Sequence, residues 1–407
     1  MGKSILVISQ YFYPEEFRIN DMCEEWVNRG YEVTVVTGIP NYPQGKFFDG
    51  YGWRKKRKEV YKGIDIVRIP IFPRGEGAVN LAFNYFSFVI SGFFWKIFTK
   101  VQADKVFIFE VSPMTQALVG VWYARKRRIP CYIYVQDLWP ENVEFAAGVH
   151  NRLLISTIDK MVDYIYKNCT RIFATSPSFV KKIEERGSAW NGKESKAVYW
   201  PQYAEEFYFP AEKKNLPDMP TGNKFKIAFT GNIGYAQGLD ILPKTALLLK
   251  KRHIECSFII IGDGRYMEEF KKEIAKDNVE DMFFLLGRKK PVEIPAYLAW
   301  CDLAFISFAD NPLFEKTIPA KLQSYMACGK PILAAATGET RRVIEEAECG
   351  RSCGLGDVEA LAQAIDDLIC ETPENMCRMS ENAVRYCRNF FGKEKLLDEI
   401  DKYFSGR

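Results

Sequence analysis

Glycines and lysines gather in the second half of the chain, where strands are expected to end. Gly231, Gly234 and Gly238 follow the apolar run "FKIAFT" and open a helical pattern, so the backbone there can approach a ligand closely. Lys316 and Lys321 flank the start of a short helical stretch that ends at "ACGKP". Free N–H groups at a helix start attract phosphate, and lysines neutralise its charge. The pattern predicts a site for a nucleotide diphosphate.

Two further loops add polar groups to this prediction. Asp263 and Arg265 follow "CSFIIIG", and Arg288 follows "MFFLLG". In open parallel sheets, ligands bind beyond the carboxyl ends of the strands, so these loops are expected at the same edge as the glycine loop. Each loop alone is compatible with ordinary turn chemistry. The combination favours a diphosphate site.

Several other chemistries fit the sequence poorly. A dinucleotide-binding dehydrogenase needs GxGxxG after a strand, but "GDGRYM" has Met267 at the third glycine position. No strand-end loop carries the closely spaced carboxylates of a metal site. His150 follows a glycine and His253 lies at an expected exposed helix end, so neither is a persuasive general base. The residues therefore predict stabilisation of a leaving diphosphate, as in sugar transfer from a nucleotide sugar.

Alternating strands and helices are expected to position these loops. "KSILVIS", "EVTVVT", "KVFIFE", "CYIYVQ" and "RIFATS" read as buried strands of the first half, separated by helical stretches. A proline-rich break near 200–224 precedes a second set of strands, which includes "LAFISF" and "PILAAA". We expect an α/β protein with two doubly wound parallel-sheet domains, residues 1–203 and 204–385, with a cleft between them. The helical segment 386–407 caps the second domain or packs back on the first.

The charge distribution and the cysteine content indicate possible partners and the cellular compartment. The 407 residues carry a net charge of +4, but 28 Lys and Arg against 20 Asp and Glu through Ala204 give the first domain an excess of +8. "WRKKRK" (53–58) and "RKRR" (125–128) suit an anionic membrane surface, nucleic acid or phosphorylated substrates, or are simply solvated. The 11 cysteines show no CxxC pair and no metal-ligand spacing, which predicts reduced, buried side chains in a cytoplasmic protein. The N-terminal stretch does not have the pattern of a signal peptide.

Residues 79–100, "VNLAFNYFSFVISGFFWKIFTK", form a long apolar run. Its length approaches that of a membrane span, but a spanning helix would place early and late strands of one sheet on opposite sides of the membrane. Two alternatives stay open: a buried helix of the first domain, or a partly exposed helix that dips into a membrane interface.

Four stretches resemble a known family. They are "YFYPEEFRINDMCEEWVNRGYEVTVVTGIPNYPQGKFFDGY" (11–51), "VQDLWPE" (135–141), "GNIGYAQGLDIL" (231–242) and "PAKLQSYMACGKPI" (319–332). The chain resembles bacterial glycosyltransferases of family four, most closely the branch of N-acetyl-L-fucosamine transferases of O-antigen and capsule assembly. The four stretches match that branch in the same order. The resemblance covers nearly the whole chain. It implies the GT-B fold, a retaining transfer from a UDP-sugar without metal or other cofactor, and a leaving phosphate that helps to deprotonate the acceptor.

The resemblance also implies donor-side residues. These are Gly231, Asn232, Gly234, Gln237, Asp263, Arg265, Arg288, Lys316, Thr317, Lys321 and Ser324. The chain departs from the family where two glutamates eight positions apart fall on Lys316 and Ser324. It departs again where an arginine and a lysine fall on Asn232 and Gln237. Lys316 and Lys321 are expected to supply the missing charge from the other side of the phosphates.

The first domain is expected to hold the acceptor. Asp137 falls near the position at which the family often has a histidine beside the transferred sugar, and Glu141 is expected to orient it or the acceptor. The acceptor-side residues of the loop after the first strand are Glu15, Glu16, Arg18 and Asn20.

The resemblance implies partners as well. These are a nucleotide-sugar donor and a polyprenyl-diphosphate-linked saccharide, with no nucleic acid. The basic excess and the apolar run of the first domain add an anionic membrane surface, bound through that domain. The protein is therefore expected peripherally at the inner face of the cytoplasmic membrane. Alternatives are a nucleotide-sugar epimerase of the same architecture and a non-catalytic sugar-nucleotide-binding protein.

Overall fold

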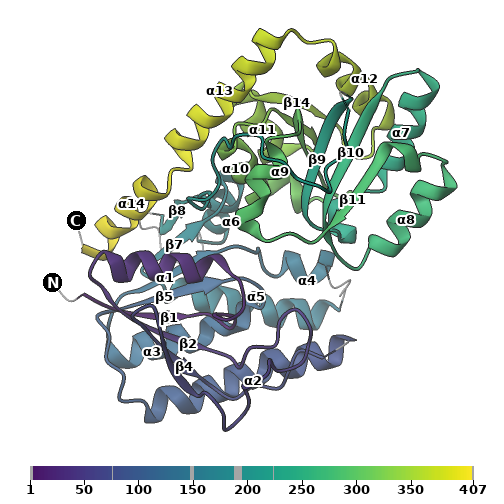
Figure 1. The fold of residues 1–407 in the computed structure, drawn as a ribbon. Coiled ribbons are helices and arrows are strands. Elements are labelled where there is room, and N and C mark those ends of the chain that lie inside the picture. Colours follow the sequence, from purple (N-terminus) through teal and green to yellow (C-terminus); the bar gives the residue numbers. More distant parts are fainter. Residues whose placement is uncertain (1–2, 76, 147–150, 188–194, 223, 406–407) are drawn as a thin grey trace. The chain divides into compact units, whose positions relative to one another are not determined.

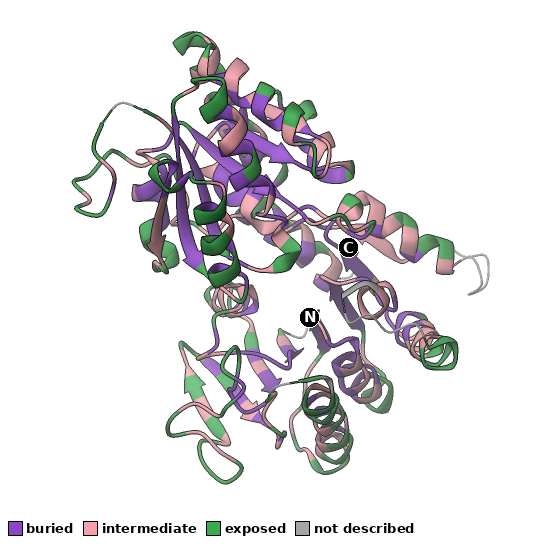
Figure 2. Ribbon diagram, turned by 90° about the vertical axis from the view of Figure 1, so that its right-hand side faces the viewer, coloured by how far each residue is buried: buried purple, intermediate pink, exposed green. Residues whose placement is uncertain are grey.

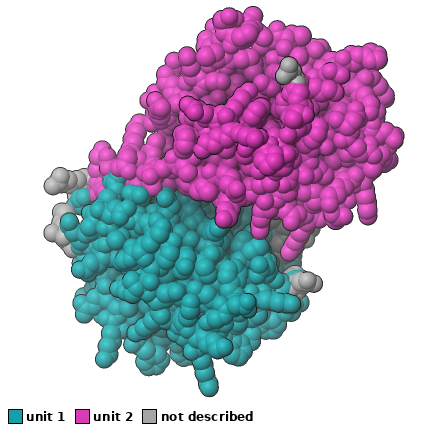
Figure 3. All heavy atoms as spheres, viewed as in Figure 1, with its two compact units in different colours: residues 1–200, 403–407 teal, residues 201–402 magenta. Residues whose placement is uncertain are grey.

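The computed structural model describes residues 3–75, 77–146, 151–187, 195–222 and 224–405. The chain divides into two compact units, which Figure 3 colours separately: unit 1 holds residues 1–200 and 403–407, and unit 2 holds residues 201–402. The first division falls between Trp200 and Pro201, next to the expected boundary at 203/204. Each unit contains one mainly parallel sheet with helices packed around it (Figure 1). The chain is therefore an α/β protein of two doubly wound domains.

The sheet of unit 1 has eight strands in the order β3-β4-β2-β1-β5-β6-β7-β8. Its strands are β1 (Ser4–Ile8), β2 (Glu32–Thr37), β3 (Lys58–Tyr61), β4 (Ile64–Arg68), β5 (Lys105–Glu110), β6 (Cys131–Val135), β7 (Arg171–Ala174) and β8 (Ala197–Tyr199). Only β3 runs antiparallel to its neighbour. The five strands expected from the β-branched and aromatic runs of the first half are present, and their central residues are buried (Figure 2).

The hairpin of β3 and β4 was not predicted. Charged residues interrupt its short apolar runs, so no strand pattern stands out in the sequence. Lys62 and Gly63 form its turn with φ angles of 48° and 80°, which suits a two-residue connection between twisted strands. Behind the hairpin, the buried Arg68 guanidinium donates to the Tyr13 carbonyl at 2.8 Å and pairs with Glu59 at 2.8 Å.

The helices of unit 1 follow the strands in the expected alternation. They are α1 (Arg18–Asn28), α2 (Gly77–Phe98), α3 (Ala117–Arg127), α4 (Glu141–Ala146), α5 (Arg152–Lys167) and α6 (Pro177–Gly187). α1, α3 and α6 pack on the sheet, whereas α2 packs on α3. The last residues of the chain also belong here, because the Phe404 ring lies 5.2–5.7 Å from the rings of Tyr132 and Trp26.

The sheet of unit 2 has six parallel strands in the order β11-β10-β9-β12-β13-β14. They are β9 (Phe225–Asn232), β10 (Cys256–Asp263), β11 (Phe283–Gly287), β12 (Leu303–Ser307), β13 (Ile332–Ala335) and β14 (Gly350–Cys353). The helices are α7 (Ile241–Lys251), α8 (Met267–Lys276), α9 (Ile294–Leu298), α10 (Ala320–Ala327), α11 (Gly338–Ala347), α12 (Val358–Ile369), α13 (Pro373–Phe390) and α14 (Lys393–Ser405). The expected C-terminal helical segment 386–407 thus comprises the end of α13 and all of α14.

Candidate functional site

The strand order of unit 2 reverses between β9 and β12, and the loops after these two strands are tied together. Ser307 Oγ donates a hydrogen bond of 2.6 Å to the Gln237 carbonyl, and Ala309 N donates one of 3.1 Å to the Ala236 carbonyl. Gly238 has φ = 57°, and a Cβ there would lie 2.4 Å from the Phe308 carbonyl oxygen. Such a reversal is where open α/β sheets bind ligands.

Lys321 reaches this reversal point from the first turn of α10. Its Nζ donates to Gln237 Oε1 at 2.5 Å and lies 4.0 Å from the centroid of the Phe229 ring. A Cβ on Gly231 would be 3.8 Å from the same amine. Burial lowers the pKa of Lys321 to about 7. Within the described part of the chain it has no carboxylate partner, so an anionic ligand at this position would restore its charge.

The ends of β9 and β10 approach each other so closely that only glycine fits between them. Gly262 has φ = 152°, and a Cβ there would lie 1.8 Å from the Gly231 carbonyl oxygen. A Cβ on Gly264 would lie 2.2 Å from the Ile233 carbonyl oxygen and 2.8 Å from Asn232 Oδ1. The structure therefore brings the expected residues Asn232 and Gly231 beside the start of the β10 loop.

The remaining polar groups of these loops are partly engaged. Asp263 Oδ1 accepts from Gly264 N at 2.8 Å, and its carbonyl accepts from Ile233 N at 3.0 Å. Gly234 has an extended backbone and precedes a 3₁₀ turn, Tyr235–Gln237. Arg265 is exposed at the end of β10 and makes no hydrogen bond within the described residues.

Residues of α11 hold the segment before α10, which includes Glu315 and Thr317, in place. Thr317 Oγ1 donates to the Leu313 carbonyl at 3.1 Å, and the Thr317 carbonyl accepts from Thr340 Oγ1 at 2.9 Å. A Cβ on Gly338, which has φ = 60°, would lie 1.9 Å from the Glu315 carbonyl oxygen. These contacts fix the backbone on which the half-buried Lys316 stands.

Ser324 and Tyr325 lie further along α10. The buried Ser324 hydroxyl donates to the Ala320 carbonyl at 3.1 Å and is thus used within the helix. Tyr325, which sequence analysis missed, accepts from Thr230 N at 2.8 Å and anchors α10 to β9. A buried tyrosine gives no sequence pattern that separates this role from ordinary core packing.

Arg288 lies apart from this cluster. It is exposed after β11, the outermost strand, and β10 separates β11 from β9. Among the described residues it forms no ion pair. The structure therefore places it at the same sheet edge as Lys321, but not in contact with it.

In unit 1, Glu15 does not present its carboxylate to solvent. The side chain is buried; Oε1 accepts from the backbone N–H groups of Asn41 and Tyr42 at 2.8 and 2.7 Å, and Oε2 accepts from Phe12 N at 3.3 Å. Burial, the largest effect, raises the pKa of Glu15 to about 7. Glu15 thus fastens the loop after β1 to the loop after β2.

The other residues of the loop after β1 are more accessible. Glu16 is exposed, while Arg18 and Asn20 are half-buried in the first turn of α1. Asn20 Nδ2 donates to the Glu15 carbonyl at 2.7 Å. Glu16 is therefore the exposed side chain of this set.

Asp137 lies at the centre of a network that sequence analysis did not find. Its Oδ2 accepts from Ser112 N at 2.8 Å and from Ser112 Oγ at 2.7 Å. Ser112 Oγ in turn accepts from Asn142 Nδ2 at 2.8 Å and Trp139 Nε1 at 3.2 Å. Ser112 therefore orients Asp137. Glu141, at the start of α4, makes no hydrogen bond to it among the described residues.

Glu110 lies beneath this network at the end of β5. It is fully buried, and its Oε2 accepts from Asp137 N at 3.4 Å. Burial, followed by the nearby Asp137 charge, raises the pKa of Glu110 well above its usual range.

His253, the histidine within the described residues, adds no candidate base. His253 follows the last turn of α7 with φ = 57° and is exposed, and His150 lies outside the described residues. A search of the described residues finds no cluster of three or more His, Cys, Asp or Glu side chains arranged for a metal ion.

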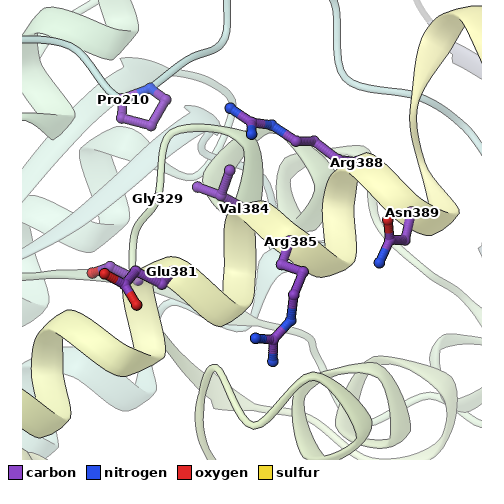
Figure 4. A pocket seen from close by; sticks show the side chains of 8 residues that line it. Pro210, Gly329, Glu381, Val384, Arg385, Arg388 and Asn389 are labelled. Atoms are coloured by element: carbon purple, nitrogen blue, oxygen red, sulfur yellow. The ribbon is translucent and has the colours of Figure 1, made fainter.

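A cavity of about 650 Å³ in unit 2 lies away from the strand ends. α13 lines it with Glu381, Val384, Arg385 and Arg388, opposite Pro210 (Figure 4). It contains none of the residues grouped around Lys321, so we do not assign it to the candidate site.

Two family models match the two halves of the chain. Residues 16–193 match the model "Glycosyl transferase 4-like domain", and residues 213–386 match "Glycosyl transferases group 1". The chain belongs to the glycosyltransferases. The reversal point of unit 2 and the loops around Lys321 therefore lie within the group 1 part of this glycosyltransferase, and Asp137 lies in the other part.

Known proteins resemble the glycosyltransferase over its whole length. The putative colanic acid biosynthesis glycosyl transferase WcaI of Escherichia coli is 23% identical, over 97% of this chain and 98% of that protein. Sucrose-phosphate synthase from Thermosynechococcus elongatus has a TM-score of 0.75 at 15% identity, with 99% and 98% of the two chains covered. Anabaena HepE in complex with UDP and glucose has a TM-score of 0.69 at 15% identity, with both chains covered fully (100%). The fold is GT-B, as the sequence predicted.

Proposed function

We propose that the glycosyltransferase moves a sugar, an N-acetylated amino sugar by resemblance, from a UDP-sugar to a saccharide carried on a polyprenyl diphosphate. The transfer retains the anomeric configuration and serves surface polysaccharide assembly of the capsule or O-antigen type. The colanic acid relative and the UDP complex of a protein with the same fold support this proposal. The protein acts peripherally at the inner face of the cytoplasmic membrane, where such an acceptor is found.

The position of Lys321 is the observation that carries the proposal. Its amine stands at the reversal point of unit 2, beside the Gly231 loop, and no carboxylate of the described chain neutralises it. A diphosphate seated there would receive the lysine charge and the N–H groups at the start of α10. Because negative charge grows on the diphosphate as the sugar leaves, these groups stabilise the transition state more than the ground state.

By resemblance, Lys316 and Ser324 stand where the family has two glutamates. The proposed donor site therefore has fewer carboxylates than the family's site. The Ser324 hydroxyl donates its proton to the Ala320 carbonyl, and its neutral oxygen is a weaker acceptor for sugar hydroxyls than the carboxylate of a glutamate. We propose that Asn232 and Asp263, at the paired ends of β9 and β10, contact the donor instead. Arg265 and Arg288 extend this set toward the nucleotide.

The first domain supplies the acceptor side. Asp137, held by Ser112, is proposed to act beside the transferred sugar. Glu16, Arg18 and Asn20 meet the acceptor, while Glu15 holds the loop that presents them. The leaving phosphate removes the acceptor proton, so the reaction uses no histidine base. Cationic side chains take the place of a metal ion.

Incubation of the protein with a panel of UDP-sugars and a polyprenyl-diphosphate saccharide tests the proposal. We expect release of UDP and a longer lipid-linked saccharide, with activity that persists in a chelator of divalent metals. An isomerised nucleotide sugar without transfer would identify an epimerase. Donor binding without either product would identify a non-catalytic binding protein.

A further inference from the structure

α2 turns a continuous apolar face to solvent. Its 22 residues include no Asp or Glu, and only 17% of the most apolar window, within Val79–Phe98, is buried. The exposed side chains recur every three or four residues and so share one helix face; they are Val79, Phe83, Phe86, Ile90, Phe94 and Ile97. Phe98, at the end of the helix, is 77% exposed. This face resolves the two alternatives left open by the sequence in favour of an exposed helix.

The opposite face of α2 is bound to unit 1 by polar contacts. Asn84 is fully buried; its Oδ1 accepts from Gln10 Nε2 at 2.7 Å, and its Nδ2 donates to the Phe72 carbonyl at 2.6 Å. A Cβ on Gly92 would lie 2.3 Å from Val119 Cγ2, so α2 and α3 are in close contact. A helix held along its length in this way lies on the domain. It cannot span a bilayer without breaking these bonds.

A cavity of about 690 Å³ opens beside the C-terminal half of α2, entirely within unit 1. One part of its wall is apolar and is formed by Phe94, Trp95 and Phe98. Another part is cationic and is formed by Arg57, Lys58 and Lys100. Among the described residues that line the cavity, none is acidic.

The cations of this cavity are available to a ligand. The Arg57 guanidinium donates to the carbonyls of Arg68 and Trp53, at 2.5 and 3.1 Å, and has no carboxylate partner in the described chain. Lys58 and Lys100 are exposed and likewise form no ion pair among the described residues. Three uncompensated positive charges beside an apolar wall match an anionic headgroup that is joined to hydrocarbon.

More positive charge lies at the same end of α2. Lys126 Nζ donates to the Lys96 and Ile97 carbonyls, at 2.9 and 3.0 Å, and so caps the helix. Lys96 Nζ lies 4.6 Å from the Phe93 ring centroid, with its stem along the apolar surface. Lys126 of the "RKRR" cluster and the end of α2 are therefore in contact, although they are separate in the sequence.

We propose that this cavity binds the phosphate headgroup of an anionic phospholipid while α2 lies in the plane of the membrane interface. The apolar face of α2 enters the headgroup and acyl boundary, and Lys58 and Lys100 contact the phosphate. This extends the membrane contact of the proposed function to a defined site, and it does not depend on the donor chemistry.

Flotation of the full chain with phosphatidylcholine vesicles, with and without phosphatidylglycerol, tests the site. We expect stronger binding to the anionic vesicles, reduced by high salt. The double variant Lys58→Gln/Lys100→Gln should lower the vesicle partition coefficient about fivefold for each lysine. The control Lys251→Gln/Lys272→Gln removes the same charge from exposed positions of unit 2 and should bind like the native protein.

A second pair of variants tests the apolar face. Phe98→Gln should weaken binding to both kinds of vesicle, whereas Phe209→Gln, at a residue 54% exposed in unit 2, should not. Equal binding of the native protein to both vesicles, or equal loss in both lysine doubles, would overturn the proposal. A dimer in light scattering that Phe98→Gln dissociates would instead show that α2 binds a second copy. UDP titration of every variant separates these outcomes from a failure of the proposed function.

Discussion

Lys321 Nζ donates a hydrogen bond to Gln237 Oε1, although the two residues are 84 positions apart in the sequence. The contact joins the start of α10 to the loop after β9 at the point where the strand order of unit 2 reverses. By resemblance, the family has a cation at the position of Gln237; here Lys321, from another element, lies beside that position instead. This exchange leads to three predictions, on donor affinity, on its pH dependence and on the stability of the free protein.

Replacement of Lys321 by Met should weaken donor binding. The variant keeps the packing of the stem against Phe229 but removes one charged contact to the diphosphate. The expected loss is about 1.5–3 kcal/mol of UDP binding free energy, measured by calorimetry. Lys272→Met, on the exposed side of α8, is the control. An unchanged dissociation constant in Lys321→Met would remove this residue from the donor site.

Donor affinity should also depend on pH through the same amine. The pKa of Lys321 is lowered to about 7 in the free protein because burial disfavours the charged form, and a bound diphosphate must raise it. UDP therefore binds with proton uptake, and its affinity falls as the pH rises above about 7. Calorimetry in buffers of different ionisation enthalpy measures that uptake. The Lys321→Met variant should lose this part of the pH dependence; if it does not, another group is responsible.

The lowered pKa of Lys321 should also make the stability of the free protein depend on pH. Above pH 7 the unfolded chain, with an ordinary lysine pKa, binds a proton that the folded chain has released. The free energy of unfolding of the native protein therefore increases as the pH rises above about 7. The Tm of the native protein should therefore rise relative to that of Lys321→Met between pH 7 and pH 9. A constant difference would mean that Lys321 keeps its charge in the fold.

The sequence predicted the elements of this site better than their contacts. Strands β9, β10 and β12 are apolar runs bounded by glycine or polar residues, so their presence and the edge at which their loops lie follow from pattern alone. The approach of Lys321 to Gln237 depends on the lengths of two loops and on the packing of Tyr325 against Thr230. No local pattern encodes such a distance.

Glu15 and α2 show two further limits of sequence patterns. A glutamate in a polar loop is usually exposed, yet Glu15 is buried because three backbone N–H groups surround its carboxylate. For α2, the apolar composition was evident, but the choice of buried face depends on Gln10 and on Val119, which lie on other elements. Asn84 lies on the face that packs on the protein, whereas Asn80, also polar, is exposed.

The glycine at position 262 should tolerate no side chain. In Gly262→Ala the Cβ would meet the Gly231 carbonyl oxygen at 1.8 Å, and φ = 152° is unfavourable for alanine. The paired ends of β9 and β10 would have to separate, at a cost of about 1–3 kcal/mol or more in unfolding free energy. Urea unfolding of the variant measures this loss. Gly52→Ala, where no atom lies within 4 Å of an added Cβ, should be close to neutral.

Asp137→Asn should lower kcat much more than donor affinity. The substitution keeps the oxygen that accepts from Ser112, so the loops after β5 and β6 remain joined, but it removes the carboxylate that we propose acts beside the transferred sugar. A group that acts mainly in the transition state affects turnover rather than ground-state binding. Steady-state kinetics with a UDP-sugar and the lipid-linked acceptor give both quantities.

Ser112→Ala separates a positioning role from a purely structural one. It removes the hydroxyl that donates to Asp137 and accepts from Asn142 and Trp139, while the carboxylate itself remains. If Asp137 acts in the reaction, Ser112→Ala should lower kcat by a smaller factor than Asp137→Asn, at similar UDP affinity. If both variants lose Tm but keep native kcat at a temperature where they are folded, the Asp137 network serves only to hold the two loops together.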